Sequence, residues 1–236
     1  MFLYCIFAAD AISTYFIRQL KLNPFRETAK MSETRKIILQ RTEALFFKYG
    51  IKSVTMDDIS RELGMSKKTL YQYFENKNDL LAQIMKLHEE HDINVLERCT
   101  VEATDAIDEL LKIAQHATVE IGKMMSAQTT VYDMQKYYRD IWNQFEQGMN
   151  QRVFLGTKDN IERGKKEGLY RENVDAEVIA KLYACKMFSI INEDVFPIYE
   201  YNKLRLFKQH LLYHIYGVAT PKGIKLFEKR IEEMKL

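Results

Sequence analysis

The chain of 236 residues is 47% hydrophobic and 29% charged, which is ordinary for a soluble globular protein with one small and one larger domain. Its formal net charge of +2 is too small to indicate a nucleic-acid partner without a local cationic arrangement. Cys5, Cys99 and Cys185 are far apart, which excludes a disulfide framework or a thiolate zinc site and favours a reducing cytoplasm. Three prolines, nine glycines and long 3.6-residue apolar periodicities predict an all-α chain of about nine to ten helices.

The N-terminal run MFLYCIFAADAISTYF has no basic segment, and Asp10 interrupts it well before the ~20 residues needed to cross a bilayer. It is a poor signal peptide and a poor membrane anchor, so we expect no membrane partner. We interpret residues 1–30 as an extension upstream of a true start at Met31. The alternative is a genuine extra helix that packs on the domain that follows.

A first amphipathic helix is predicted from Glu33 to Tyr49, where an apolar stripe ends at Gly50. Three helix starts are then predicted within about twenty residues. Each has a side chain suited to an N-cap, and two of these caps have an acidic partner three residues later. The starts are Thr55 with Asp58, Ser66 just after Gly64, and Asn76 with Asp79.

The middle helix, predicted over Lys67 to Tyr73, is too short to be stable alone, so packing must hold it. Its apolar face carries Leu70 and Phe74. The opposite face is cationic, rich in hydrogen-bonding groups and free of carboxylates, which suits a helix presented to a DNA major groove. A solvated face on a small bundle is the alternative. The exposed set is Lys68, Thr69, Tyr71 and Gln72, flanked by Lys67 and Tyr73.

Residues 35–81 resemble the DNA-binding domain of the TetR family of transcriptional regulators. The residues that carry the resemblance are Ile38, Leu39, Leu45, Phe46, Gly50, Thr55, Ile59, Gly64, Ser66, Thr69, Leu70, Tyr71, Tyr73, Phe74, Lys77, Leu80 and Leu81. Thr42 and Ser60 stand where the family prefers alanine, Met65 where it prefers valine, and Lys68 where glycine is common.

The resemblance implies a three-helix helix-turn-helix head over residues 31–91, with the helix-turn-helix at 54–73, followed by a helical-bundle domain for effector binding and dimerisation over 92–236. A double-stranded DNA operator, a second copy of the chain and a small-molecule effector are the partners it implies. We expect Lys68, Thr69, Tyr71 and Gln72 to approach base edges, and Thr55, Ser66, Lys67, Tyr73 and Lys77 to hold phosphates.

In the body, apolar periodicity predicts a helix from about Thr104 to Ala127, a shorter one from Val131 to Tyr138, and another long one that holds Ile141 to Ile161. Val119 is among the residues expected to line the first of them. Two further helices are expected at about Asp175 to Phe196 and Tyr199 to Tyr216, with a charged tail helix after Pro221. Aromatic and Met side chains exceed what a minimal core needs and are candidates for an effector pocket, with plain core packing as the alternative. They are Met124, Met125, Tyr132, Tyr137, Tyr138, Trp142 and Phe145.

The last helix pair carries more apolar width than one body needs, which predicts a two-fold four-helix interface. The residues assigned to it are Val178, Leu182, Ile190, Phe207, Leu211 and Ile215. A charge at Leu211 is expected to give monomers that no longer bind the operator.

Two histidine pairs are candidates for metal ligands. His88 and His91 are three apart, unlike the zinc motif H-E-x-x-H, and a solvated surface is the better interpretation. His210 and His214 are four apart, and packing or hydrogen bonding at an interface is preferred. We expect no metal, no cofactor and no catalytic residue. The leading function is a ligand-responsive repressor, and the alternative is a DNA-binding protein of the same fold that acts through a protein partner without an effector.

Overall fold

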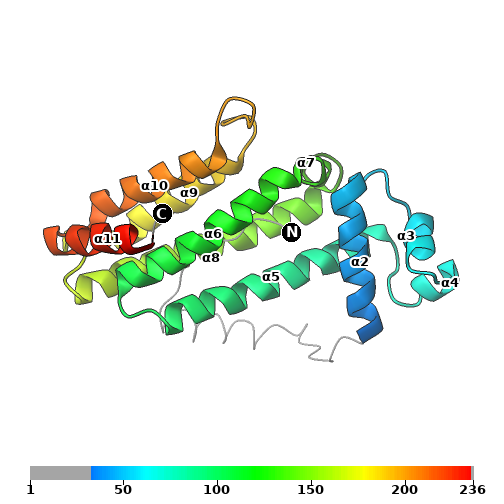
Figure 1. Cartoon of the computed structure of the whole chain (residues 1–236), viewed down its shortest axis with the longest axis horizontal. Coiled ribbons are helices and arrows are strands. Elements are labelled where there is room, and N and C mark those ends of the chain that lie inside the picture. The colour runs from blue at the N-terminus through cyan, green and yellow to red at the C-terminus, as the bar shows by residue number, and fades with distance from the viewer. Residues whose placement is uncertain (1–32, 235–236) are drawn as a thin grey trace.

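The computed structural model describes residues 33–234, and these form ten helices that divide into a small head and a long body (Figure 1). The helices are α2 (Glu33–Tyr49), α3 (Met56–Glu62), α4 (Lys67–Leu70), α5 (Lys77–Val101), α6 (Ala106–Ser126), α7 (Gln128–Tyr137), α8 (Arg139–Lys166), α9 (Ala176–Ile191), α10 (Lys203–Val218) and α11 (Pro221–Met234). The only β pairing within these residues is an isolated bridge between Tyr170 and Ala219. The all-helical class predicted from the sequence is confirmed, whereas residues 1–30 lie outside the described part of the chain.

The head consists of α2, α3 and α4 packed on the first turns of α5. The predicted caps are all present: Thr55 and Asp58 form a capping box, and Ser66 and Asn76 accept hydrogen bonds from the third residue of their helices. Gly64 ends α3 with φ +66°, in the left-handed region that favours glycine. These caps fix the two turns of the motif, because each satisfies helix-end groups that would otherwise need water.

Helix α4 is shorter than predicted and ends at Leu70 rather than Tyr73. Residues 71–73 tighten into a turn in which Gln72 N donates to Thr69 O at 3.1 Å and Tyr73 N to Leu70 O at 3.0 Å. Such i→i+3 bonds commonly close the last turn of a helix. The tighter turn directs Phe74, which is buried, back towards the head core.

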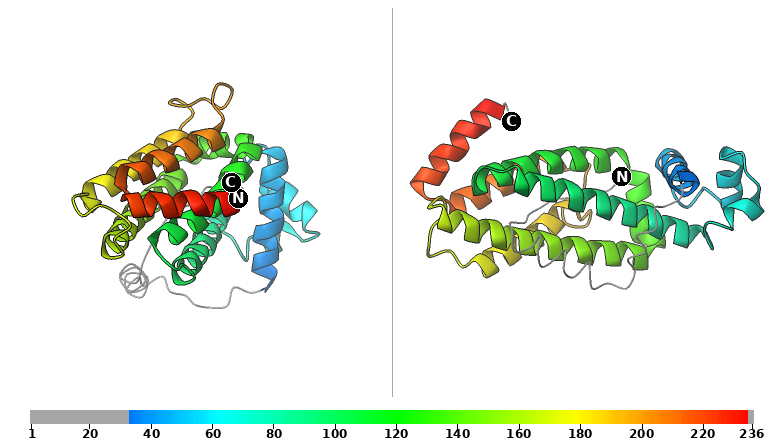
Figure 2. Two further views of the ribbon diagram at one scale, coloured as in Figure 1. Left: turned by 60° about the vertical axis from the view of Figure 1, so that its left-hand side comes forward. Right: turned by 90° about the horizontal axis from the view of Figure 1, so that it is seen from below.

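The body is a bundle whose long helices run along the axis of the molecule, with α8 packed against α6, α7 and α9 (Figures 1 and 2). Helix α11 lies at the end of the bundle opposite the head. It is tied there by Arg230, whose guanidinium donates to Asp105 at 2.6 and 2.7 Å. A Cβ at Gly164 would overlap the Tyr170 ring, so glycine allows α8 to touch the segment that leads to α9.

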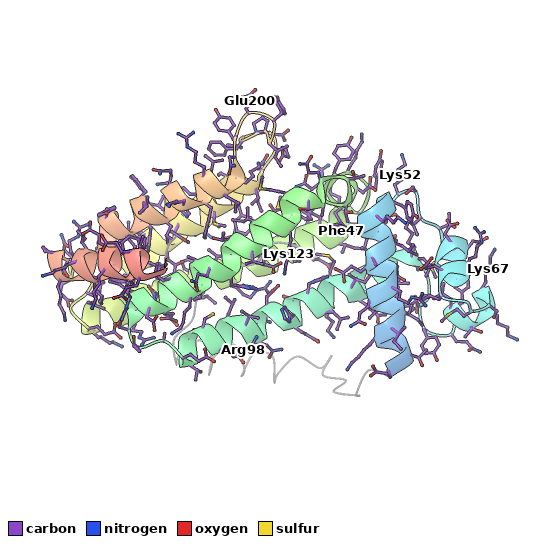
Figure 3. The ribbon with its side chains drawn as sticks, in the orientation of Figure 1. Phe47, Lys52, Lys67, Arg98, Lys123 and Glu200 are labelled. Atoms are coloured by element: carbon purple, nitrogen blue, oxygen red, sulfur yellow. The ribbon has the colours of Figure 1, made fainter. Side chains whose placement is uncertain are left out.

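Two predicted helix boundaries in the body are wrong. Helix α9 ends at Ile191, not Phe196, and α10 begins at Lys203, not Tyr199, because Asn192 leaves the helix in an extended conformation and Asn202 caps the next one. The loop between them projects from the body, with Glu200 at its tip (Figure 3). Val119, expected in the core, lies on the surface of α6. No helix among residues 33–234 is long and apolar enough to cross a membrane.

Candidate DNA-binding site

The outer end of the head presents the exposed face of α4 and the turn that follows it. Leu70 and Phe74 are buried, as is Ile59 of α3, and these contacts hold a helix too short to be stable alone. Lys68, Tyr71 and Gln72 are exposed on the other side, and Lys67 lies at the end of the molecule far from the body (Figure 3). The structure therefore brings together the residues expected to approach base edges, except that Thr69 is partly covered.

Several residues expected to hold phosphates already have intramolecular partners in the head. The Thr55 hydroxyl accepts from Asp58 N at 3.2 Å and lies 2.6 Å from the Asp58 carboxylate. Ser66 Oγ caps α4 and lies 2.8 Å from the Thr69 hydroxyl. Lys67 Nζ forms an ion pair with Asp57 at 2.5 Å. Thr55, Ser66 and Lys67 are exposed, so a phosphate at the surface could replace these intramolecular contacts or add to them.

Lys77 lies differently from the expectation. Its ammonium points inward, donates to the Ile51 carbonyl, and lies 5.8 Å from the ring centroids of both Phe46 and Tyr138. Burial lowers the Lys77 pKa, an effect that the negative charges of Asp133 and Asp58 oppose. This lysine thus ties the start of α5 to the head and the body, because a charged donor half-buried beside a backbone carbonyl is held by that hydrogen bond. Tyr73 is likewise partly buried against the head core.

Helix α7 of the body clasps the end of α2, a contact that the sequence did not reveal. Thr130 Oγ1 donates to the Phe46 carbonyl at 2.9 Å, and the Asp133 carboxylate accepts from Lys52 N at 2.8 Å. Gly50 lies in the same contact with φ +80°, and a Cβ there would come within 3.0 Å of the Asp133 carboxylate. Gly50 therefore both ends α2 and leaves room for the clasp. The partners are about eighty residues apart in sequence, and no local pattern marks them.

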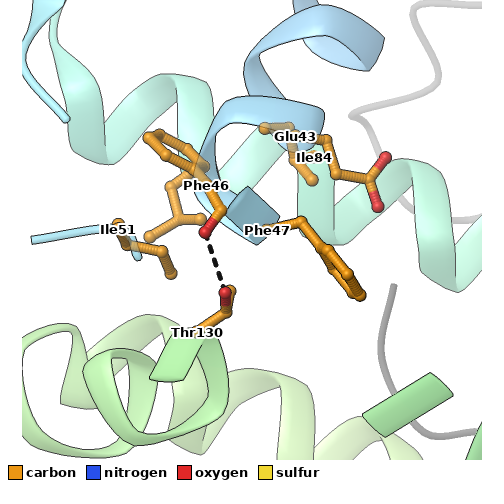
Figure 4. Close-up of a pocket in the computed structure, with 7 residues that line it drawn as sticks. Glu43, Phe46, Phe47, Ile51, Ile84 and Thr130 are labelled. Carbon is orange, nitrogen blue, oxygen red and sulfur yellow. Dashed lines mark hydrogen bonds between the residues drawn. The ribbon is translucent and has the colours of Figure 1, made fainter. Parts of the chain in front are cut away.

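A small apolar pocket opens beside this clasp, between α2, α5 and α7 (Figure 4). Its volume is about 260 Å³ including space open to solvent, which is below the range of about 300–1,000 Å³ usual for ligand pockets. None of its lining residues belongs to the set predicted for effector binding. They are Glu43, Phe46, Phe47, Ile51, Leu81, Ile84 and Thr130.

The residues predicted for an effector pocket separate into three groups. Met124, Trp142 and Phe145 are buried in the body, and Met125 and Tyr138 are partly covered. Tyr132 and Tyr137 are 52% and 42% exposed, so their placement in an internal pocket is wrong. Both rings lie under the Lys136 ammonium, at 4.9 and 5.5 Å from their centroids, and a tyrosine on an amphipathic surface helix can keep its hydroxyl in water this way.

The residues predicted for the dimer interface divide into a buried group and an exposed group. Ile190, Phe207, Leu211 and Ile215 are buried inside a single body, so their assignment to an intersubunit surface is wrong. An apolar stripe shows which side of a helix avoids water, but not whether its own chain or a second one covers it. Val178 and Leu182 are about half exposed on α9, so their assignment to a dimer interface stays a prediction. Tyr213 and Tyr216 of α10, which the sequence interpretation missed, are exposed as well.

The two histidine pairs occupy different environments. His88 Nε2 lies 2.8 Å from the Glu43 carboxylate of α2, whereas His91 is exposed. His210 and His214 are buried against the Tyr183 ring, with centroid distances of 4.1 and 4.6 Å. The first pair thus does not share one environment, and the second is an aromatic cluster inside the body.

Residues 38–84 match the family model described as bacterial regulatory proteins, tetR family. Over 68 residues the chain is 34% identical to the HTH-type transcriptional regulator TtgR of Pseudomonas putida, an overlap of 28% of this chain and 32% of TtgR. The chain thus spans about a third of this relative's length in that match. The head of the chain therefore matches the DNA-binding domain of the TetR family.

The likeness of this chain to other proteins extends beyond the head at lower identity. It is 22% identical over 166 residues to the uncharacterized HTH-type transcriptional regulator YhgD of Bacillus subtilis (strain 168), covering 66% of this chain and 83% of YhgD. The structure of SmeT, the repressor of the Stenotrophomonas maltophilia multidrug efflux pump SmeDEF, superposes with a TM-score of 0.63 and 20% identity. That match covers 81% of this chain and 93% of SmeT, so the two share the fold of both head and body.

Proposed function

We propose that this protein is a DNA-binding transcriptional regulator, acting as a repressor, that reads a palindromic operator as a homodimer and responds to a small molecule bound in its body. The observation that carries this proposal is the exposed, cationic, hydrogen-bonding face of α4 on a rigidly capped helix-turn-helix. Side chains at such a position can reach base edges in a major groove, where glutamine pairs with adenine and lysine with guanine.

Within this proposal the head residues have two roles. Lys68, Tyr71 and Gln72 are free to approach bases because they are exposed on the outer face. Ser66 and Lys67 lie at the N-terminus of α4, where backbone N–H groups and a cationic side chain favour a phosphate. Lys77 is not assigned a phosphate, since its ammonium is directed at the Ile51 carbonyl.

Response to a small molecule is supported by the neighbours of the body rather than by a cavity in it. The SmeT–triclosan complex superposes with a TM-score of 0.63 over 80% of this chain. Head and body are joined by the α7 clasp and by the continuous helix α5, so a conformational change in the body can move the head. The alternative, a protein of this fold that acts through a protein partner without an effector, is favoured by the surface tyrosines of α7 and the exposed loop after α9.

Selection of bound sequences from random duplex DNA with the full chain tests the central claim. We expect enrichment of an inverted repeat whose half-sites are one DNA turn apart or a multiple of it. Recovery of sequences without two-fold symmetry, or no enrichment over non-specific binding, would contradict the proposal. Addition of a crude small-molecule extract from the host, with loss of the selected complex as readout, then separates an effector-responsive regulator from one that depends on a protein partner.

A further inference from the structure

An ordered loop, residues 192–202, projects from the body between α9 and α10 (Figures 1 and 3). Lys203 is buried, and its ammonium donates to the Phe196 carbonyl and lies 2.9 Å from the Glu193 carboxylate. The same carboxylate accepts from Ile198 N at 2.9 Å. The loop therefore has a defined shape, because a buried ammonium with a charged partner fixes its backbone.

The outer side of this loop is apolar and acidic. Tyr199 is 83% exposed, and Val195 and Tyr201 are nearly half exposed. Asp194 and Glu200 are exposed as well, and neither carboxylate forms an ion pair within residues 33–234. Tyrosine is enriched at protein interfaces, because its ring buries a large area while its hydroxyl finds a polar partner. An ordered loop with such a tip is typical of a contact surface.

A cationic patch lies on α7 and on the turn after α2, and we call it the lysine–tyrosine patch. Lys52 Nζ donates to the Tyr137 hydroxyl at 3.1 Å and lies 4.2 Å from the centroid of that ring. Lys136 Nζ lies over the rings of Tyr132 and Tyr137. All four side chains are exposed, and neither ammonium pairs with a carboxylate in the described part of the chain. Asp133 of the same helix is buried and accepts from a backbone N–H instead.

The loop and the patch are complementary in charge and in kind. The loop presents carboxylates beside exposed apolar side chains, and the patch presents ammonium groups on exposed rings. Glu200 and Lys52 both lie along the upper edge of the molecule in the view of Figure 3. No hydrogen bond, ion pair or ring contact joins loop and patch among the described residues. One chain thus carries both halves of a contact that it does not close on itself.

A two-fold dimer can close this contact twice. In an isologous pair, the loop of each subunit meets the patch of the other by the same symmetry operation. The loop joins α9 to α10, so it is continuous with their exposed residues Val178, Leu182, Tyr213 and Tyr216. A second subunit seated on that face lies beside the loop.

We propose that, in the homodimer, the loop of residues 192–202 of each subunit docks on the lysine–tyrosine patch of the other. Asp194 and Glu200 pair with Lys52 and Lys136 across the contact, and the exposed loop aromatics pack against the patch tyrosines. The patch adjoins the α7 clasp, so the loop of one subunit stabilises the junction of head and body in the other. The inference rests on the homodimer of the proposed function and adds a contact outside the helix faces.

Charge reversal on one surface at a time tests the contact. The loop variant is Asp194→Lys/Glu200→Lys, and the patch variant is Lys52→Glu/Lys136→Glu. Each homodimer then faces like charges twice, so we expect its dissociation constant from sedimentation equilibrium to rise roughly tenfold or more. When the two variants are co-expressed with different tags, both contacts of the mixed dimer join opposite charges. The mixed dimer should therefore exceed its statistical share, and the excess should shrink as salt screens the charges.

Matched reversals elsewhere control for net charge. Glu90→Lys/Glu172→Lys and Lys86→Glu/Lys225→Glu change the charge by the same amounts at exposed positions outside the loop and the patch. These variants should dimerise like the wild type and mix at random. Circular dichroism of every variant shows whether the helices persist.

The wild-type full chain supplies a second measurement that does not depend on the folding of any variant. A carbodiimide joins carboxylates directly to amines that touch them. In the covalent dimer, isolated under denaturing conditions, mass spectrometry should find Asp194 or Glu200 linked to Lys52 or Lys136. Absence of these links, or loop and patch variants that dimerise and mix like the controls, would overturn the inference.

Operator binding is measured separately on the same proteins. A patch variant that keeps the dimer but loses operator affinity would assign the patch to the DNA backbone and overturn the inference. The links in a dimer that selects no DNA sequence would defeat the proposed regulator alone, whereas an operator-binding dimer without them defeats this inference alone. A wild-type monomer would defeat both the homodimer and the contact.

Discussion

The buried imidazoles of His210 and His214 make the stability of the body depend on pH. Burial lowers the His210 pKa to about 4, helped by the charge of Lys186. Burial, then His210 and Lys186, lowers the His214 pKa to about 3. In the unfolded chain both imidazoles bind protons as the pH falls below about 6.5, whereas in the folded chain they do not. Their stabilising contribution is therefore complete above pH ~6.5, and it is lost as the pH falls from there towards the lowered pKa values of the folded chain.

We expect the free energy of unfolding of the wild type to fall by up to about 1.4 kcal/mol per pH unit for each imidazole between pH ~6.5 and ~4.5. The double variant His210→Gln/His214→Gln should show a shallower dependence, whatever its stability at neutral pH. Urea unfolding across this range measures the slopes, with the exposed His91→Gln as control. Parallel slopes for the double variant and the wild type would mean that these imidazoles are not the groups that titrate on unfolding.

Glu109 acts in the opposite direction over part of the same range. Burial raises its pKa to about 7, although Asn160, Thr100 and Arg163 each donate to or attract the carboxylate. The folded chain thus keeps a proton that the unfolded chain releases near pH ~4.5, so this contribution to stability is lost as the pH rises from there to about 7. Glu109 is present in the wild type and in the histidine variants, so its effect on the pH dependence of stability cancels when their slopes are compared.

Gln72 and Lys77 provide a second contrast at the residue scale. Gln72→Ala should weaken operator binding by roughly 1–3 kcal/mol and relax the preference at one position per half-site, since Gln72 is exposed on the groove-facing side. Lys77→Ala should instead lower the free energy of unfolding by roughly 1–3 kcal/mol, because the Ile51 carbonyl loses a charged donor. Binding isotherms and thermal unfolding of both variants separate the roles. Identical changes in affinity and specificity for the two would refute them.

At the scale of elements, the clasp between α7 and the end of α2 should decide how firmly the head is held. Asp133→Ala leaves the Lys52 N–H without its acceptor and should destabilise the protein by roughly 1–3 kcal/mol. Amide hydrogen exchange should then accelerate around residues 50–54 more than in the head core. Glu172→Ala, at an exposed position in the turn before α9, is the control. Unchanged exchange at Lys52 in Asp133→Ala would show that the clasp is not what orders this turn.

The elements that could be predicted from sequence are those fixed by local chemistry. The caps at Thr55, Ser66 and Asn76 are confirmed, since an N-cap is a contact between residues two or three apart. The inward turn of Lys77 could not be predicted, because its partner Ile51 lies 26 residues earlier and is reached only by packing. The clasp at Asp133 is hidden for the same reason, with a separation of 81 residues.

Helix faces are harder to assign than helix positions. Leu211 and Leu182 are both leucines on amphipathic helices, yet one is buried in its own body and the other is half exposed. Periodicity gives an apolar side, and the tertiary packing decides how much of that side the chain covers by itself. A charge at Leu211 is therefore expected to unfold the body rather than to separate two folded subunits.

At the scale of the whole molecule, the exposed face of α9 and α10 is where we expect the second subunit. Val178 and Leu182 lie one turn apart on α9, and Tyr213 and Tyr216 are exposed on α10. Two heads rigidly joined at about 34–36 Å, or a multiple of it, are needed to read a palindrome, since one recognition helix contacts too few base pairs for useful specificity. Such an interface should bury on the order of 2,000 Å² or more.

Leu182→Glu should convert the dimer into a folded monomer that loses operator binding, because a carboxylate would be buried against its two-fold copy without a partner. The matched control is Val119→Glu on α6, a residue 54% exposed against 51% for Leu182 and absent from the α9–α10 face. Sedimentation velocity gives the mass, and circular dichroism shows whether the helices persist. We expect Val119→Glu to remain a dimer with wild-type affinity for DNA. A wild-type protein that is a monomer and binds its operator fully would refute the dimer, and a Leu182→Glu variant that stays dimeric would place the subunit contact elsewhere.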